Sequence, residues 1–144
     1  MAGVDKSTVE RLSQIELFRR CSRKDLEALA AIVSEVAVPA GAVLCDQGRV
    51  ADESFIVIEG EADVRIGGDL VSTAGPGDPI GEMALLDHLP RSATVTAATP
   101  MRLYSISAAR FESLLDSTAI ARGLLEHLSL RVRELQVGRG PLHI

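Results

Sequence analysis

Hydrophobic residues recur at helical spacing at both ends of the chain, whereas the middle follows a shorter period. Near the N-terminus, Leu26, Leu29 and Val33 lie three or four residues apart, which places them on one face of a helix. The segment from about 117 to 137 has a similar apolar stripe. This stripe consists of Ile120, Leu124, Leu125, Leu128, Val132 and Leu135. We therefore expect helices within 7–35 and within 107–137.

Two capping-box patterns mark where the N-terminal helices begin. Ser7 is followed three residues later by Glu10, and Ser22 is followed in the same way by Asp25. In a capping box, each of the two side chains accepts a hydrogen bond from the backbone N–H of the other residue. We expect one helix to begin beside Ser7 and a second beside Ser22.

From 36 to 106 the chain alternates short apolar and β-branched runs with turns rich in glycine and proline. The triplet at 67–69, Gly-Gly-Asp, is typical of a tight hairpin turn between two strands. The clearest strands are Val43–Cys45, Ser54–Ile58, Glu61–Ile66, Arg91–Ala97 and Met101–Ile106. Many short strands separated by turns are typical of an all-β barrel or jelly roll. The sequence therefore predicts a fold that is mainly β with flanking helices.

Composition and charge narrow the class of protein. The chain has 144 residues, of which 47% are hydrophobic and 24% charged, so one sizeable core can form over 1–144. The net charge of −5 disfavours a strongly basic nucleic-acid-binding protein. The longest apolar run, 28–33, is too short to span a membrane, and 1–6 lacks the apolar core of a signal peptide. We expect a cytoplasmic domain in which Cys21 and Cys45 are reduced.

The segment from 77 to 95 carries the most informative polar chemistry. Gly81 permits an unusual backbone angle or a close approach, and the good helix formers 82–86 follow it. A short helical turn leaves its first backbone N–H groups, near Met83 and Ala84, without a partner inside the helix. Such donors favour an anion.

An arginine and a glutamate add to this pattern. Arg91 shares strand parity with Ala93 and Val95, so its side chain is predicted to point inward at the mouth of the barrel. A buried guanidinium needs an anionic partner, and it can hold a phosphate through two parallel hydrogen bonds. A carboxylate beside a phosphate repels it, so Glu82 makes sense if it accepts a hydrogen bond from a hydroxyl such as a ribose 2′-OH.

Simpler interpretations stand beside this one. Glu82 can neutralise Arg91 without any ligand, and an acid at a helix N-terminus is common. The three histidines, His88, His127 and His143, lie far apart in the sequence and do not form a metal-ligand pattern. No Ser-His-Asp or Cys-His arrangement is evident. We therefore expect no enzyme activity, no metal and no resident cofactor.

Two halves of this segment together resemble the phosphate-binding cassette of the cyclic-nucleotide-binding domain family. They are Gly81-Glu82-Met83-Ala84-Leu85-Leu86 and Pro90-Arg91-Ser92-Ala93-Thr94-Val95. Weaker likeness at 38–41, 58–64 and 111–115 extends the resemblance to about 12–135. It implies an eight-stranded β-roll (jelly roll) with N-terminal helices and two C-terminal helices. The expected boundaries are 7–35 for the N-terminal helices, 36–106 for the β-roll and 107–137 for the C-terminal helices.

The resemblance also implies a role for the cassette residues. Glu82 would bind the ribose 2′-hydroxyl, and Arg91 would bind the cyclic phosphate. The backbone contacts to the phosphate oxygens would come from Met83, Ala84 and Ala93.

Ser92 and two departures from the family pattern refine this expectation. Ser92 would add a hydroxyl to the phosphate or the base. Pro79-Ile80 stands where the family commonly has a bulky aromatic pair, and Ala51-Asp52 stands where it has a Gly-Asp turn. Neither departure touches the glutamate or the arginine of the cassette.

The expected function is that of a receptor or regulatory domain for a cyclic nucleotide. In the family, Ser or Ala after the cassette arginine goes with cAMP and Thr often goes with cGMP, so Ser92 favours cAMP, with cGMP as the second candidate. One alternative is a degenerate β-roll that has lost the nucleotide and acts as a protein-interaction module. A metal-dependent enzyme on a similar jelly roll is a more distant alternative.

The last helix is the element that we expect to move on binding. A barrel encloses phosphate and ribose, but the purine projects toward its open end and needs a cover. Arg131, Val132 and Leu135 are the residues that we expect to contact the base. The same helix is also a candidate surface for a homodimer, and its simplest role is core packing.

DNA and an effector protein are the other partners to consider. Only seven residues follow Val137, too few for a helix-turn-helix, so we expect no DNA binding by this chain. Whether it stands alone or belongs to a channel, a kinase or another enzyme is open, and the effector protein is unidentified.

Overall fold

The computed structural model describes residues 5–139, and of 135–139 it describes the backbone alone. The chain divides into two compact units. One unit comprises residues 1–30 and 114–144 and is called the helical unit here. The other comprises residues 31–113 and is called the β unit.

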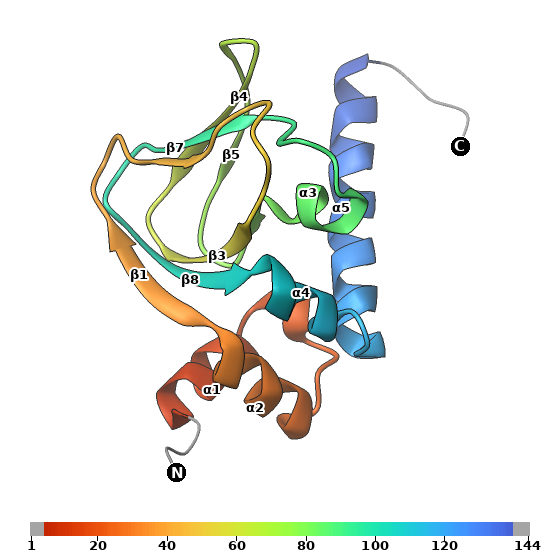
Figure 1. Ribbon diagram of the computed structural model, residues 1–144. Coiled ribbons are helices and arrows are strands. Elements are labelled where there is room, and N and C mark those ends of the chain that lie inside the picture. Colours follow the sequence, from red (N-terminus) through yellow and green to blue (C-terminus); the bar gives the residue numbers. More distant parts are fainter. Residues whose placement is uncertain (1–4, 140–144) are drawn as a thin grey trace. The chain divides into compact units, whose positions relative to one another are not determined.

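The β unit contains two four-stranded antiparallel sheets (Figure 1). One sheet has the strand order β1-β8-β3-β6 and the other the order β2-β7-β4-β5. The strands are β1 (Ser34–Val38), β2 (Val43–Cys45), β3 (Glu53–Glu59), β4 (Ala62–Ile66), β5 (Asp69–Ala74), β6 (Pro79–Ile80), β7 (Thr94–Ala97) and β8 (Met101–Ser107). Two short helices, α3 (Glu82–Asp87) and α4 (Ala108–Leu114), follow β6 and β8. The expected mainly β fold with an eight-stranded roll and flanking helices is confirmed.

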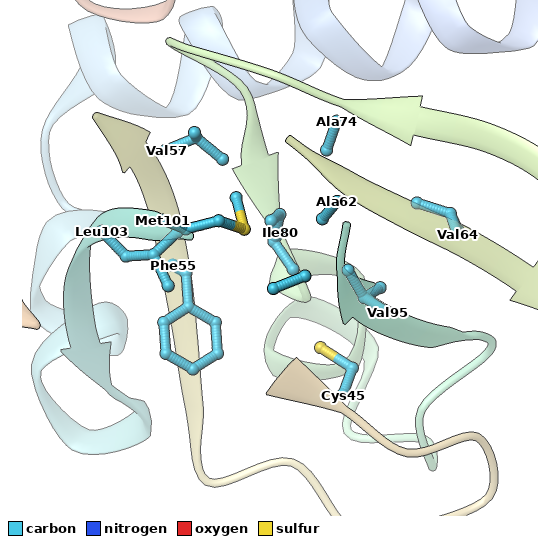
Figure 2. Close-up of a cluster of buried hydrophobic side chains, with 11 residues drawn as sticks. Cys45, Phe55, Val57, Ala62, Val64, Ala74, Ile80, Val95, Met101 and Leu103 are labelled. Atoms are coloured by element: carbon cyan, nitrogen blue, oxygen red, sulfur yellow. The ribbon is translucent and has the colours of Figure 1, made fainter. Parts of the chain in front are cut away.

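Alternate side chains of these strands form an aliphatic core. Its buried members are Cys45, Phe55, Val57, Ala62, Val64, Ala74, Ile80, Val95, Ala97, Met101 and Leu103. Figure 2 shows Val57, Ile80 and Met101 converging from different strands. Only one of the eleven, Phe55, is aromatic, so the core is mainly aliphatic, as the composition predicted. Val95 belongs to β7, which follows the segment that links α3 to this strand.

The turns of the β unit agree with the glycine pattern. Gly67 and Gly68 link β4 to β5 with φ values of 58° and 88°, as a tight hairpin with two left-handed residues requires. The first strand begins at Ser34, two residues before the expected boundary. All five residues of β1 pair with β8. Because of this pairing, Ser34 and Glu35 belong to a strand, although the N-terminal helices were expected to extend as far as residue 35.

The helical unit contains α1 (Lys6–Ser13), the 3₁₀ turn η1 (Glu16–Phe18), α2 (Arg23–Ile32), which reaches two residues beyond it, and α5 (Thr118–Arg139). The capping box of Ser22 and Asp25 is confirmed, because each side chain accepts a hydrogen bond from the other's backbone N–H at 3.1 and 3.0 Å. The box expected at Ser7 is wrong. Asp5 caps α1 instead, since its carboxylate accepts a hydrogen bond from the Ser7 N–H at 2.9 Å.

The turn η1 and the helix α5 contact each other closely within the helical unit. Gly123 lies so near Leu17 that a Cβ atom on it would collide with the Leu17 carbonyl oxygen. Glu126 accepts hydrogen bonds from Arg19 and Arg20, each at 2.9 Å. A glycine and an ion-paired carboxylate therefore join segments more than 100 residues apart in the sequence.

The apolar stripe of α5 is narrower than expected. Ile120 and Leu124 are buried, but Leu125 is 68% exposed, so its assignment to the packed stripe is wrong. It lies about 100° from Leu124 around the helix, which turns it out of the buried face. Within the described part of the chain, no helix is both long and apolar enough to cross a membrane.

Candidate functional site

Gly81 sits at the junction between β6 and α3 in the β unit. Its φ of 77° and ψ of 15° lie in the left-handed region, where a residue with a Cβ atom is disfavoured. A Cβ atom at this position would also collide with Nη1 of Arg91 and would lie 3.0 Å from the Cys45 Sγ. Glycine is therefore required here both by the backbone angle and by the approach of an arginine.

Arg91 is buried, with an exposed fraction of 6%. Its Nη1 donates a hydrogen bond to the Gly81 carbonyl at 2.9 Å, and its Nη2 donates to the Glu53 carbonyl at 2.7 Å. The backbone is also fixed, because the Arg91 N–H donates to Arg49 and its carbonyl accepts from Gly48. Arg91 is buried as expected, but the strand expected over Arg91–Ala97 begins only at Thr94. The direction of its side chain is therefore fixed by these contacts and not by strand alternation.

The Arg91 guanidinium has no acidic partner among the described residues. The ion pairs between described side chains do not include this arginine, so the pairing of Arg91 with Glu82 that the sequence left open does not form. Two neutral carbonyl groups satisfy part of its hydrogen-bonding capacity, but no carboxylate of a described residue forms an ion pair with it. A buried charge in this state is costly unless an anion binds.

Glu82 begins α3 and is 5% exposed. None of the described residues donates a side-chain or capping hydrogen bond to its carboxylate. A carboxylate in these surroundings accepts a hydrogen bond readily from an incoming hydroxyl.

The Cys45 thiol lies near the charged groups of Arg91, Glu82 and Glu53. Burial raises the pKa of Cys45 to about 11, the positive charge of Arg91 opposes this, and the negative charges of Glu82 and Glu53 add to it. All three charged residues therefore act on one sulfur atom. The thiol stays protonated near neutral pH, which makes it an inert core group rather than a nucleophile.

The remaining cassette residues differ in what they present. Met83 is 48% exposed and Ala84 is buried, and neither side chain has a charged or hydrogen-bonding group, so the polar groups that these two residues supply are those of the backbone. The N–H groups of this first turn have no acceptor inside the helix. Ser92 is exposed and Ala93 half-buried, just before β7. The structure thus joins the two halves of the cassette through the contact of Arg91 with Gly81.

The structure does not place Arg131 in this group. Arg131 is a half-buried residue of α5 in the helical unit, and Val132 beside it is exposed. The side chain of Leu135 lies outside the described residues. The base-contacting role expected for these three residues remains a proposal.

Two contributors to the site were not predicted from the sequence. Arg91 is held by the backbone carbonyl of Glu53, and the carboxylate of Glu53 accepts a hydrogen bond from the Ser105 hydroxyl at 2.7 Å. A backbone carbonyl leaves no trace in the sequence, because every residue has one. Ser105 lies 52 residues beyond Glu53, and only the pairing of β3 with β8 brings them together.

Across the part of the chain that the structure describes, no three His, Cys, Asp or Glu side chains gather in a way that would hold a metal ion. His88 has Glu112 beside it, with 3.4 Å between Nε2 and Oε1. His143, the third histidine considered from the sequence, lies outside the described residues.

Comparisons with known proteins agree with this geometry. The family model for the cyclic nucleotide-binding domain matches residues 35–118, which is more than half of the chain. A cyclic nucleotide-gated potassium channel of Rhizobium etli is 37% identical over 107 residues. That match covers 74% of this chain but only 30% of the channel.

Two solved structures are also similar. The regulatory domain of Toxoplasma gondii PKA in a co-crystal with cAMP is 31% identical, with a TM-score of 0.69, over 76% of this chain and 45% of that one. A cyclic nucleotide-binding domain from Methylobacillus flagellatus KT is 26% identical, with a TM-score of 0.80, over 100% of this chain and 89% of that one. The matched family segment contains the whole cassette, from Gly81 to Ala93. The chain therefore belongs to the cyclic nucleotide-binding domain family.

Proposed function

We propose that this domain is a receptor for cAMP and that it signals through movement of α5. The cyclic phosphate would bind Arg91 and the backbone N–H groups at the start of α3. The ribose 2′-hydroxyl would donate to Glu82. The similarity to a PKA regulatory domain crystallised with cAMP supports this choice of ligand.

The observation that carries the proposal is that Arg91 is buried without an ion pair to a described residue. A 6% exposed guanidinium with two carbonyl partners and no carboxylate among the described residues is suited to an anion of fixed position. Arg102, an exposed arginine of the same unit, has Glu35 and Glu59 at 2.8 and 2.7 Å. Arg91 therefore differs from Arg102 of the same unit in having no carboxylate partner among the described residues.

Isothermal titration of the wild type and of Arg91→Ala with cAMP tests the proposal. Loss of one partner of a buried charged pair costs about 2–5 kcal/mol, which is roughly 30-fold to several-thousand-fold in affinity. Arg65→Ala is the matched control, because Arg65 is an exposed arginine of β4 outside the cassette. Equal affinity of the Arg91→Ala variant and the wild type would show that the cassette does not bind the phosphate.

Ser92 is the residue on which the choice between cAMP and cGMP depends. It is exposed at the edge of the cassette and offers a hydroxyl to a ligand. Because a hydroxyl is present, as in Thr, we expect the preference for cAMP to be modest, about a few-fold. Competition by cGMP that is tenfold stronger than by cAMP would overturn this preference.

The role of α5 has its own test. Binding shifts an open–closed equilibrium only by the difference in affinity for the two states. We expect amide hydrogen exchange in 130–137 to slow when cAMP is added. Truncation after Ser129 should leave a folded chain with weaker binding and faster dissociation. Unchanged exchange together with unchanged affinity would leave α5 as a packing element.

The exposed side of α5 is also the surface that we propose for a homodimer. A groove of about 810 Å³ in the helical unit is lined by Leu115, Leu125 and Leu130 among others. Leu125→Glu should lower the apparent mass in sedimentation if two copies meet there. A mass that corresponds to one copy for both proteins would exclude self-association through this groove.

The alternative function, a degenerate roll that binds a protein and no nucleotide, makes the opposite prediction for the titration. Wild-type protein that takes up neither cAMP nor cGMP would favour it. The chain spans about 30% of the channel relative's length, so the regulated effector would be a further domain or a separate protein.

A further inference from the structure

Glu53, the first residue of β3, has two acceptor groups that bind different partners. Its backbone carbonyl accepts from Nη2 of Arg91 at 2.7 Å, and its carboxylate accepts from the Oγ of Ser105 at 2.7 Å. Strands β3 and β8 are neighbours, and Glu53 pairs with Ser107 in the ladder. Ser105, two residues earlier, therefore lies diagonally across on the same face.

This arrangement leaves an acid close to Arg91 without an ion pair between them. Because the guanidinium already touches the Glu53 backbone, the Glu53 carboxylate is within one side-chain length of it. No carboxylate of a described residue nevertheless lies within 4.0 Å of the Arg91 nitrogens. The hydroxyl of Ser105 holds the nearby Glu53 carboxylate instead.

We propose that Ser105 is a positioning residue that keeps the Glu53 carboxylate away from Arg91 and so leaves the guanidinium available to an anionic ligand. The inference rests on the proposed binding of cyclic phosphate at Arg91. An arginine–carboxylate pair is a strong charge-assisted contact. A ligand phosphate would have to break such a pair before it could bind, and the Ser105 hydrogen bond prevents the pair from forming.

Removing the hydroxyl should therefore create a competitor inside the site. In Ser105→Ala the Glu53 carboxylate loses its donor and rotates toward Arg91. If the new ion pair occupies 90% of the nucleotide-free molecules, the apparent affinity for cAMP falls about tenfold, since it scales with the competent fraction. The double variant Ser105→Ala/Glu53→Gln lacks both the hydroxyl and the charge, so it should bind within about twofold of the wild type.

Titration of these variants with cAMP tests the inference. Ser113→Ala is the matched control, because Ser113 makes only a local hydrogen bond on α4. A weaker Ser105→Ala variant that Glu53→Gln rescues supports the role. Rescue would also show that Ser105→Ala does not act by destabilising the fold. The Glu53→Gln substitution removes a charge but does not fill the space that the Ser105 hydroxyl leaves. Wild-type affinity in Ser105→Ala, or no rescue in the double variant, overturns it and leaves the proposed function intact.

A crystal structure of nucleotide-free Ser105→Ala tests the same inference without any ligand. A Glu53 carboxylate within 4 Å of the Arg91 guanidinium would support it, and a carboxylate that stays away would overturn it. If the wild type bound no cyclic nucleotide, the proposed function would fail, and this structure would still decide whether Ser105 separates the two charges.

Discussion

The arginines of the two units have different partners. In the helical unit, Arg19 and Arg20 both bind the carboxylate of Glu126, and all three side chains are exposed. In the β unit, Arg91 is buried and binds two backbone carbonyls. Exposed ion pairs contribute little to stability because water and salt screen them. An arginine buried without an ion pair is unfavourable for folding, so stability alone does not explain its position.

Two glycines, one in each unit, also differ in the atoms that they contact. Gly81 lies against the side chain of Arg91, whereas Gly123 lies against the backbone of Leu17. The first approach shapes a candidate site, and the second joins α5 to η1 within the helical unit. Variants at these positions and at the nearby acids can therefore separate binding from packing.

Gly81→Ala should have the largest effect among these variants. It forces a Cβ atom into a left-handed backbone and onto the guanidinium, and we expect a loss of about 2–4 kcal/mol in the free energy of unfolding. Displacement of Arg91 should also weaken cAMP binding by about tenfold or more. Urea unfolding and titration measure the two losses.

Gly75→Ala is the matched control for this variant. A Cβ atom at Gly75 meets nothing within 4 Å, and its φ is not in the left-handed region. If Gly81→Ala were as stable and bound as tightly as Gly75→Ala, the close approach of Arg91 would not matter.

Glu82→Ala should weaken cAMP by about 1.5–3 kcal/mol, the range for a hydrogen bond to a charged group. The variant should barely change the affinity for 2′-deoxy-cAMP, which lacks the hydroxyl. Parallel titrations with the two ligands separate binding from structure. Equal losses for both would mean that Glu82 supports α3 and does not contact the ribose.

Gly123→Ala distinguishes helix propensity from packing in the helical unit. Propensity alone would stabilise α5 by about 1 kcal/mol. The collision with the Leu17 carbonyl should reverse the sign and destabilise the protein by about 1–3 kcal/mol, as overpacking does. Urea unfolding gives the sign directly, and a more stable variant would contradict the close contact between α5 and η1.

Glu126→Gln should have the smallest effect, and that effect should depend on pH. The hydrogen bond from Arg19 is the main reason that the pKa of Glu126 is lowered from its ordinary 4.5. A lowered carboxyl pKa stabilises the fold above the ordinary value, and this contribution is lost as the pH falls through the folded-state value. Thermal unfolding of both proteins should therefore differ slightly at pH 7 and converge below pH 4.5. A stability difference between the two proteins that grows as the pH falls would contradict this stabilising role of ionised Glu126.

Local sequence patterns predicted the short helix α3 and a buried Arg91, although the strand expected to carry Arg91 begins only at Thr94. The alternation at 91–97 predicts a buried Arg91, and the glycine before a short helix-forming run predicts α3. The α3 prediction holds because a glycine before helix-forming residues is a local signal. The capping box at Ser22 holds for the same reason. Arg91 is buried for another reason, since it precedes β7 and its direction is fixed by contacts with Gly81 and Glu53.

Other features depend on choices that the sequence pattern does not resolve. Asp5 and Ser7 are both good capping residues, and only the path of the chain selects Asp5. Leu125 continues an apolar stripe but is exposed, because a periodic pattern does not say which neighbours cover it. The separation of Glu53 from Arg91 by Ser105 requires a strand pairing between distant segments.

The short helix α3 is bounded at both ends by left-handed residues, Gly81 with a φ of 77° and His88 with a φ of 60°. A residue in this conformation ends a right-handed helix, so α3 can grow in neither direction. Its six residues have a fixed rise of about 9 Å, and one inserted residue would rotate everything after it by about 100°. Arg91 lies three residues beyond His88 and would be carried out of position. Related sequences with the same site should therefore vary between 82 and 87 by substitution and not by insertion or deletion.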